Sequence, residues 1–87
     1  DPATHRSVIE EGDFRTVIVG CSSADQGVGV AQEMVADGVQ LIELCGGFGP
    51  VWTGRIIEAI DGAVPVGSVG YGPESIDGMA RLFPPAD

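Results

Sequence analysis

Three short apolar segments alternate with segments of helical periodicity, and this alternation limits the possible folds more than any other feature. The apolar segments are FRTVIVG (14–20), VQLIELCG (39–46) and VPVGSVG (64–70). Each is rich in β-branched residues, and each is followed by one segment with helical spacing of its apolar residues. Strands that are apolar on both faces and joined by single helices are typical of parallel sheets with right-handed crossovers. The sequence therefore predicts an α/β fold: a small, mostly parallel three-stranded sheet built from alternating βα units, with helices packed on it.

Start and stop signals define four predicted helices. Asp1 and Pro2 suit the start of a first helix, and Gly12 suits its end. The other predicted helices cover residues 22–38, 49–62 and 73–83. Residues 1–87 are interpreted as a single domain. Because three strands make a thin sheet, we expect either a further strand before Asp1 or assembly with another subunit.

Charge and hydropathy exclude several kinds of partner. The chain has 13 acidic and 4 basic residues and a formal net charge of −9. Its arginines are scattered, so it cannot form the basic face that nucleic acid requires. The same acidity disfavours anionic membrane surfaces, and no apolar segment is long enough for a membrane span. Two cysteines without metal-type spacing read as reduced thiols, which predicts a cytoplasmic protein.

The residue types present predict neither a cofactor nor a metal. The chain contains no lysine, which excludes a Schiff base and a P-loop lysine within it. The segment GVGVAQ (27–32) departs from the dinucleotide fingerprint, because Gln32 replaces the last small residue and the preceding strand is too distant. His5 is the only histidine, so a metal centre is not expected.

Residues rich in Gly, Ser and Cys follow each predicted strand. In open parallel sheets, ligands bind beyond the carboxyl ends of the strands, where helix N-termini present N–H groups. The predicted ligand-binding residues at this edge are Cys21, Ser22, Ser23, Gly46, Gly47, Phe48, Ser68 and Tyr71. The opposite edge carries acidic helix ends. Short βα turns also need glycine, so a purely structural interpretation of these loops stays open.

Two side chains of the second predicted strand are candidate catalytic residues. Glu43 lies within an apolar segment, where a carboxylate must be paired or shielded, and either state suits a general acid or base. Cys45 lies on the same strand face, and a thiol near a helix N-terminus is favoured as a nucleophile. The alternatives are an ion pair of Glu43 with Arg55 or Arg6, a solvated Glu43 on an edge strand, and a small apolar packing role for Cys45.

The segments DPATHR (1–6), DGVQLIELCGGFGP (37–50) and VPVGSVGYG (64–72) resemble a family of small uncharacterised bacterial domains. The resemblance covers most of the chain. It implies a further apolar strand just before the segment equivalent to Asp1–Pro2, and it implies no particular activity.

The segments GVQLIELCGGFGPVWTGRIIEAI (38–60) and VPVGSVGY (64–71) carry a second, local resemblance, which is to the second and third βα units of tryptophan synthase alpha-type barrels. This resemblance implies that Glu43 is a general base and that Phe48 walls a loop. The aspartate of that family's loop is replaced here by Gly49-Pro50, and 87 residues cannot close an eight-stranded barrel. We interpret the likeness as a shared solution for a βα unit.

The leading prediction is a domain that forms a homo-oligomer and binds a small anionic or polar metabolite at the strand carboxyl edge. The centre of this site would be formed by Glu43, Cys45, Gly46 and Gly47. One alternative is a lyase or isomerase with Glu43 as its base. Another is a structural subunit that assembles with its copies and binds no ligand. A solvent-exposed Glu43, together with three glycine-rich loops that lie apart, would contradict both the binding and the catalytic hypotheses.

Overall fold

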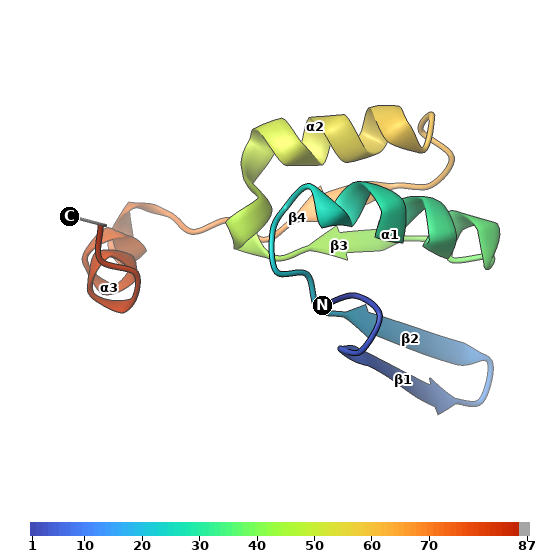
Figure 1. Ribbon diagram of the computed structural model, residues 1–87. Helices are drawn as coiled ribbons and strands as arrows, with labels where there is room; N and C mark the ends of the chain where they lie inside the picture. Colours follow the sequence, from blue (N-terminus) through green and yellow to red (C-terminus); the bar gives the residue numbers. More distant parts are fainter. Residues whose placement is uncertain (86–87) are drawn as a thin grey trace.

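The computed structural model describes residues 1–85, and within them four short strands form two separate two-stranded sheets (Figure 1). Three α-helices and two 3-10 turns complete this part of the chain. In chain order the elements are β1 (Arg6–Glu11), β2 (Phe14–Val19), α1 (Gln26–Ala36), β3 (Ile42–Leu44), η1 (Gly46–Phe48), α2 (Gly49–Ala59), β4 (Val66–Ser68), η2 (Pro73–Ser75) and α3 (Ile76–Leu82).

The predicted N-terminal helix over residues 1–12 is wrong, because most of this segment is strand β1. A turn does begin at Asp1, whose carbonyl accepts the backbone N–H of His5 at 2.8 Å, but the turn stops there. Gly12 does not end a helix. With a φ of +59° it opens a two-residue turn, completed by Asp13, that reverses the chain into β2. Glycine at the first turn position is typical of tight hairpins.

The predicted three-stranded, mostly parallel sheet is also wrong. Strand β2 pairs antiparallel with β1 along its whole length, from Arg6↔Val19 to Glu11↔Phe14. Parallel pairing occurs only between β3 and β4, which α2 connects. The physical reason is local: a two-residue turn brings β1 to β2 with little loss of chain entropy. The hairpin therefore satisfies the backbone of one β2 edge without the second sheet.

The core lies between the β3–β4 pair and the helices α1 and α2, which pack on one side of it (Figure 1). The buried hydrophobic residues are Ala31, Ile42, Leu44, Ile56 and Ile60. Ile42 and Leu44 alternate along β3 and point toward the helices, so Glu43 between them points the other way. No helix covers that second face within the described residues (Figure 1).

The chain is more extended than its length requires. Its Cα radius of gyration is 14.4 Å, whereas a compact domain of 87 residues has a value of about 12 Å. Two segments account for this. The hairpin projects below the second sheet, and α3 lies beyond the carboxyl ends of β3 and β4 on an extended connection (Figure 1).

Candidate functional site

The N-termini of α1 and α2 meet at one edge of the molecule, next to the carboxyl end of β3. The two helix ends are in contact through the ring of Phe48, the last residue of η1, which packs against the first turn of α1. A Cβ atom built on Gly27 would stand 2.6 Å from a ring carbon of Phe48 and 3.1 Å from Cδ1 of Ile56. Only a residue without a side chain allows this approach. The missing Cβ of Gly27 therefore permits the two helix N-termini to share an edge.

The loop after β4 joins the same edge through Tyr71. A Cβ atom on Gly46 would stand 2.8 Å from the Tyr71 ring and 3.2 Å from the carbonyl oxygen of Val69. The backbone N–H of Val69 donates to the carbonyl of Leu44 at 2.9 Å, which extends the parallel pairing past β4. The loops after β3 and β4 are thus packed directly on each other, with Gly46 at the contact.

The backbone N–H groups at this edge differ in whether they donate a hydrogen bond to another backbone group. In α1 the first N–H groups donate to carbonyls three residues earlier, for example Gly27 to Ala24 at 3.0 Å. By contrast, the N–H groups of Gly46 and Gly47 make no hydrogen bond within residues 1–85. Helix α2, which follows them, has no side-chain cap and no acidic residue in its first turn. The bend at η1 therefore has two N–H donors without an acceptor among residues 1–85, next to the N-terminal end of α2.

Glu43 lies outside this bend, and its solvent exposure agrees with one of the alternatives left open, a solvated side chain on an edge strand. Its side chain is exposed and lines a shallow cavity of about 260 Å³ with Gly67, Ser68 and Val69. Strand alternation puts this cavity on the sheet face opposite the helices. Ser68 borders this cavity, but its register with Leu44 places its side chain on the opposite sheet face from Glu43; the cavity does not include Gly46 and Gly47.

The arginines considered as partners of Glu43 are engaged with other groups. The Arg55 guanidinium lies over the Trp52 ring, 4.5 Å from its centroid. Arg6 forms a two-point ion pair with Glu33, with distances of 2.8 Å and 2.9 Å. Within residues 1–85, no ion pair forms at Glu43.

The two cysteines and Ser22, which were also predicted at the site, lie apart from the Glu43 cavity. Cys45 is exposed and immediately precedes η1, and Cys21 is half-buried; both thiols are free. The strands that precede them belong to different sheets, so the two cysteines do not follow adjacent strands. Ser22 binds locally: its N–H donates to the Gln26 side chain at 2.7 Å, and its hydroxyl accepts the Asp1 ammonium at 3.3 Å.

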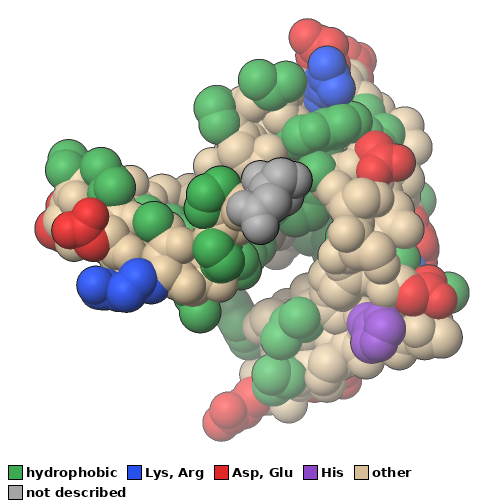
Figure 2. All heavy atoms as spheres, turned by 60° about the vertical axis from the view of Figure 1, so that its left-hand side comes forward, with side chains coloured by type: hydrophobic (Ala, Val, Ile, Leu, Met, Phe, Trp, Pro, Cys, Tyr) green, Lys and Arg blue, Asp and Glu red, His purple; other side chains and the backbone are tan. Residues whose placement is uncertain are grey.

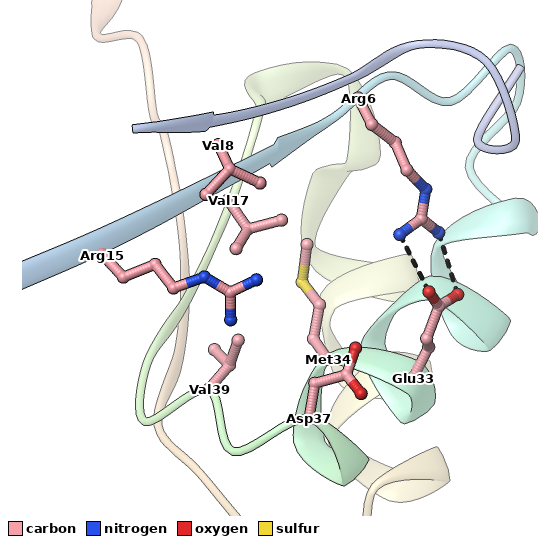
Figure 3. A pocket seen from close by; sticks show the side chains of 8 residues that line it. All are labelled: Arg6, Val8, Arg15, Val17, Glu33, Met34, Asp37 and Val39. Atoms are coloured by element: carbon pink, nitrogen blue, oxygen red, sulfur yellow. Dashed lines mark hydrogen bonds and ion pairs between the residues drawn. The ribbon is translucent and has the colours of Figure 1, made fainter. Parts of the chain in front are cut away.

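A second cavity, of about 70 Å³, separates the hairpin from the C-terminal half of α1 (Figure 3). Its lining residues are Arg6, Val8, Arg15, Val17, Glu33, Met34, Asp37 and Val39. Arg6 donates a hydrogen bond to the Glu33 carboxylate, and this bond is the main reason that the pKa of the Arg6 guanidinium lies above its usual value; desolvation opposes the rise, and the negative charges of Glu33 and Asp37 add to it. The sequence interpretation missed this cavity because it assigned β1 to a helix. Val8 and Val17 lie opposite each other in the paired strands β1 and β2, and this match was the signal in the sequence that could have indicated the hairpin.

Two further properties bear on partners. Within residues 1–85, no group of three or more His, Cys, Asp or Glu side chains is placed to hold a metal ion. Among the helices described, none has both the length and the apolar character needed to cross a membrane.

Comparisons with known proteins identify the family and nothing beyond it. No curated protein and no solved structure is significantly similar to the chain, and the local likeness to tryptophan synthase alpha-type barrels has no support from them. The match that is found spans residues 1–84, almost the full length. On this match, the chain belongs to the family of unknown function DUF6506.

Proposed function

We propose that this domain binds a small anionic or polar metabolite at the bend between β3 and α2. The observation that carries the proposal is the pair of N–H groups at Gly46 and Gly47, which donate no hydrogen bond within residues 1–85. They precede a helix with no acidic residue in its first turn. In a chain with a net charge of −9, such a position is a local exception to the acidic surface.

The chemistry of the bend fits an acceptor-rich ligand. Backbone N–H groups and the N-terminal end of α2 together favour negative charge, as at many phosphate sites. Two aromatic rings flank the bend: Phe48 is half-buried and Tyr71 is 58 % exposed. The Tyr71 hydroxyl would add a donor at the rim. Carboxylated or phosphorylated metabolites supply the acceptors that these groups would bind.

The test is a titration followed by ¹H–¹⁵N NMR, with inorganic phosphate and simple dicarboxylates as probes. The amides of Gly46 and Gly47 are expected to shift in a saturable way. A matched pair of variants isolates charge: Gly47→Asp adds a carboxylate, whereas Gly47→Asn adds a neutral group of the same size. A Cβ atom at Gly47 meets nothing within 4 Å, so both variants should fold.

We expect Gly47→Asn to retain binding and Gly47→Asp to weaken it at least about tenfold, which corresponds to roughly 1.4 kcal/mol. Equal affinities for the two variants would contradict the proposed role of charge at this bend. Absence of saturable shifts with every probe would contradict the proposal itself.

The observations favour binding over catalysis by Glu43. A general base works best when its carboxylate is within reach of the bound substrate and partly removed from water. Here Glu43 is exposed and lies on the uncovered sheet face, in a cavity that the bend does not share. No observation specifically favours a lyase or isomerase.

A further inference from the structure

The two sheets of the chain share one covering helix but do not pair with each other. Helix α1 contacts both: Ala31 is buried with Ile42 of β3, and Glu33 forms the ion pair with Arg6 of β1. Strand β2, helix α1 and strand β3 follow one another in the chain, and the two strands point the same way (Figure 1). This is the arrangement of a βαβ crossover, yet no ladder joins β2 to β3 within residues 1–85.

The edge of β2 that points away from β1 has unpaired backbone groups. The N–H of Gly20 donates to the carbonyl of His5 at 2.8 Å, which fixes the bonded pairs of the hairpin. Because bonded and non-bonded pairs alternate along an antiparallel ladder, the backbone groups of Arg15, Val17 and Val19 point outward. These groups make no hydrogen bond within the part of the chain that the structure describes.

Strand β3 has a free edge of the same kind. The N–H of Ile42 donates to the carbonyl of Pro65 at 3.0 Å. The carbonyl of Leu44 accepts from the N–H of Val69 at 2.9 Å. Alternate residues of a strand bond to the same neighbour, so the backbone groups of Glu43 face away from β4. In Figure 1, β2 lies between β1 and β3, so its free edge is on the side of β3. We call the space between these two edges the strand slot.

Apolar side chains of α1 form the floor of the strand slot. On a helix that turns about 100° per residue, Val30 and Met34 lie between two directions. One is that of Ala31, which faces the core, and the other is that of Glu33, which contacts the hairpin. Val30 and Met34 are only half-buried, and Met34 also borders the cavity of about 70 Å³ in Figure 3. In Figure 2 an open hollow lies next to the histidine that precedes β1 (purple).

We propose that the strand slot binds an extended apolar segment of a separate polypeptide, which pairs with β2 on one side and with β3 on the other. Both edges present N–H and C=O groups at strand spacing, and an extended backbone supplies matching acceptors and donors on both of its sides. A helix has already used these groups within itself. The bound segment completes a five-stranded sheet in the order β1, β2, segment, β3, β4.

The surroundings of the slot define the chemistry of the segment. Every second side chain would meet Val30 and Met34, so that face of the segment is apolar. The chain carries a net charge of −9, which favours a segment with basic residues next to its apolar part. The partner is therefore a short strand with an apolar face and basic ends.

The first test is a titration of the ¹⁵N-labelled chain with the blocked peptide acetyl-Lys-Val-Thr-Val-Thr-Val-Lys-amide. Its valines form one face and its threonines the other. The amide signals of Val17 and Glu43 are expected to shift together in a saturable way, and both amides should exchange more slowly with solvent. Absence of saturable shifts would overturn the proposal. Protection of these amides that rises with chain concentration alone would also overturn it, because a second copy would then fill the slot.

Two N-methylated peptides test whether both edges are used. In a strand, the backbone groups of alternate residues point to opposite neighbours. N-methylation of the central valine removes a donor on one side, and N-methylation of the next threonine removes a donor on the other. Insertion between β2 and β3 predicts that each modification weakens binding by about tenfold. Weakening by only one of them would show addition to a single edge and would refute insertion.

A matched pair of variants tests the floor of the slot. Val30→Asp places a carboxylate toward the bound segment, whereas Gln32→Asp places the same group on the opposite side of α1. Val30→Asp should weaken binding of the unmodified peptide by at least about tenfold, and Gln32→Asp by less than about twofold. Circular dichroism checks that both variants fold. Equal affinities would overturn the assigned position of the segment, independently of any metabolite bound at Gly46 and Gly47.

Discussion

Replacement of Gly27 and of Gly29 in α1 by alanine should have different effects on stability, although the two glycines lie two residues apart. Gly27 is buried, and a Cβ there would meet the Phe48 ring at 2.6 Å and Ile56 at 3.1 Å. A Cβ on Gly29 meets nothing within 4 Å. Neither glycine has a positive φ, so alanine fits the backbone at both positions. The two variants therefore differ in packing alone.

The magnitudes follow from two opposing effects. Exchange of glycine for alanine in a helix contributes up to about 1 kcal/mol to stability, somewhat less in a first turn. Inserting a methyl group into a packed contact costs about 1–3 kcal/mol. Gly29→Ala is therefore expected to stabilise by up to about 1 kcal/mol, whereas Gly27→Ala should be neutral or destabilise by up to about 2 kcal/mol. The two variants should differ by about 1–3 kcal/mol.

The assay is urea unfolding followed by circular dichroism, with thermal melting as a second measurement. For a domain of this size, about 1 kcal/mol shifts the melting temperature by about 4–8 °C. Equal stabilisation by both substitutions would refute the contact between α1 and Phe48. A further variant identifies the clash: Phe48→Leu should cost less in the Gly27→Ala background than in the parent, because the smaller side chain relieves the overlap.

Two other substitutions test the core and the hairpin. In urea unfolding, Ile56→Ala should destabilise the domain by about 2–5 kcal/mol, whereas Ile57→Ala should destabilise it by less than about 1 kcal/mol. The reason is that Ile56 is 0 % exposed and Ile57 is 39 % exposed. Similar losses for the two variants would contradict the assigned core. Arg6→Gln should speed amide exchange in β1 and β2 but not in α2, because it removes the ion pair with Glu33. Since the pKa of Arg6 is raised, its contribution is complete below the usual arginine pKa and is lost only above the raised value. Salt, rather than pH near neutrality, should therefore loosen the hairpin; unchanged exchange in Arg6→Gln would refute this anchoring role.

The sequence pattern was sufficient to predict those helices and strands whose formation depends on residues close together in the chain. Strands β2, β3 and β4 lie within the apolar segments that predicted them, and the three helices lie within predicted helical segments. The convergence of loops at the strand carboxyl ends was also predictable, since it depends on chain direction. The segment from Arg6 to Glu11 was misassigned because capping residues stand before it and a glycine after it. Those residues suit a turn and a hairpin equally well.

The sequence by itself therefore determined most of the elements and the edge at which the loops after β3 and β4 meet. Only the tertiary structure decided that β2 pairs with β1 and not with β3, because pairing depends on which backbone edge is nearest once the Gly12 turn forms. It also decided the surroundings of Glu43. Strand alternation fixes that its side chain points away from Leu44, but whether another layer covers that face depends on where distant segments such as α3 pack.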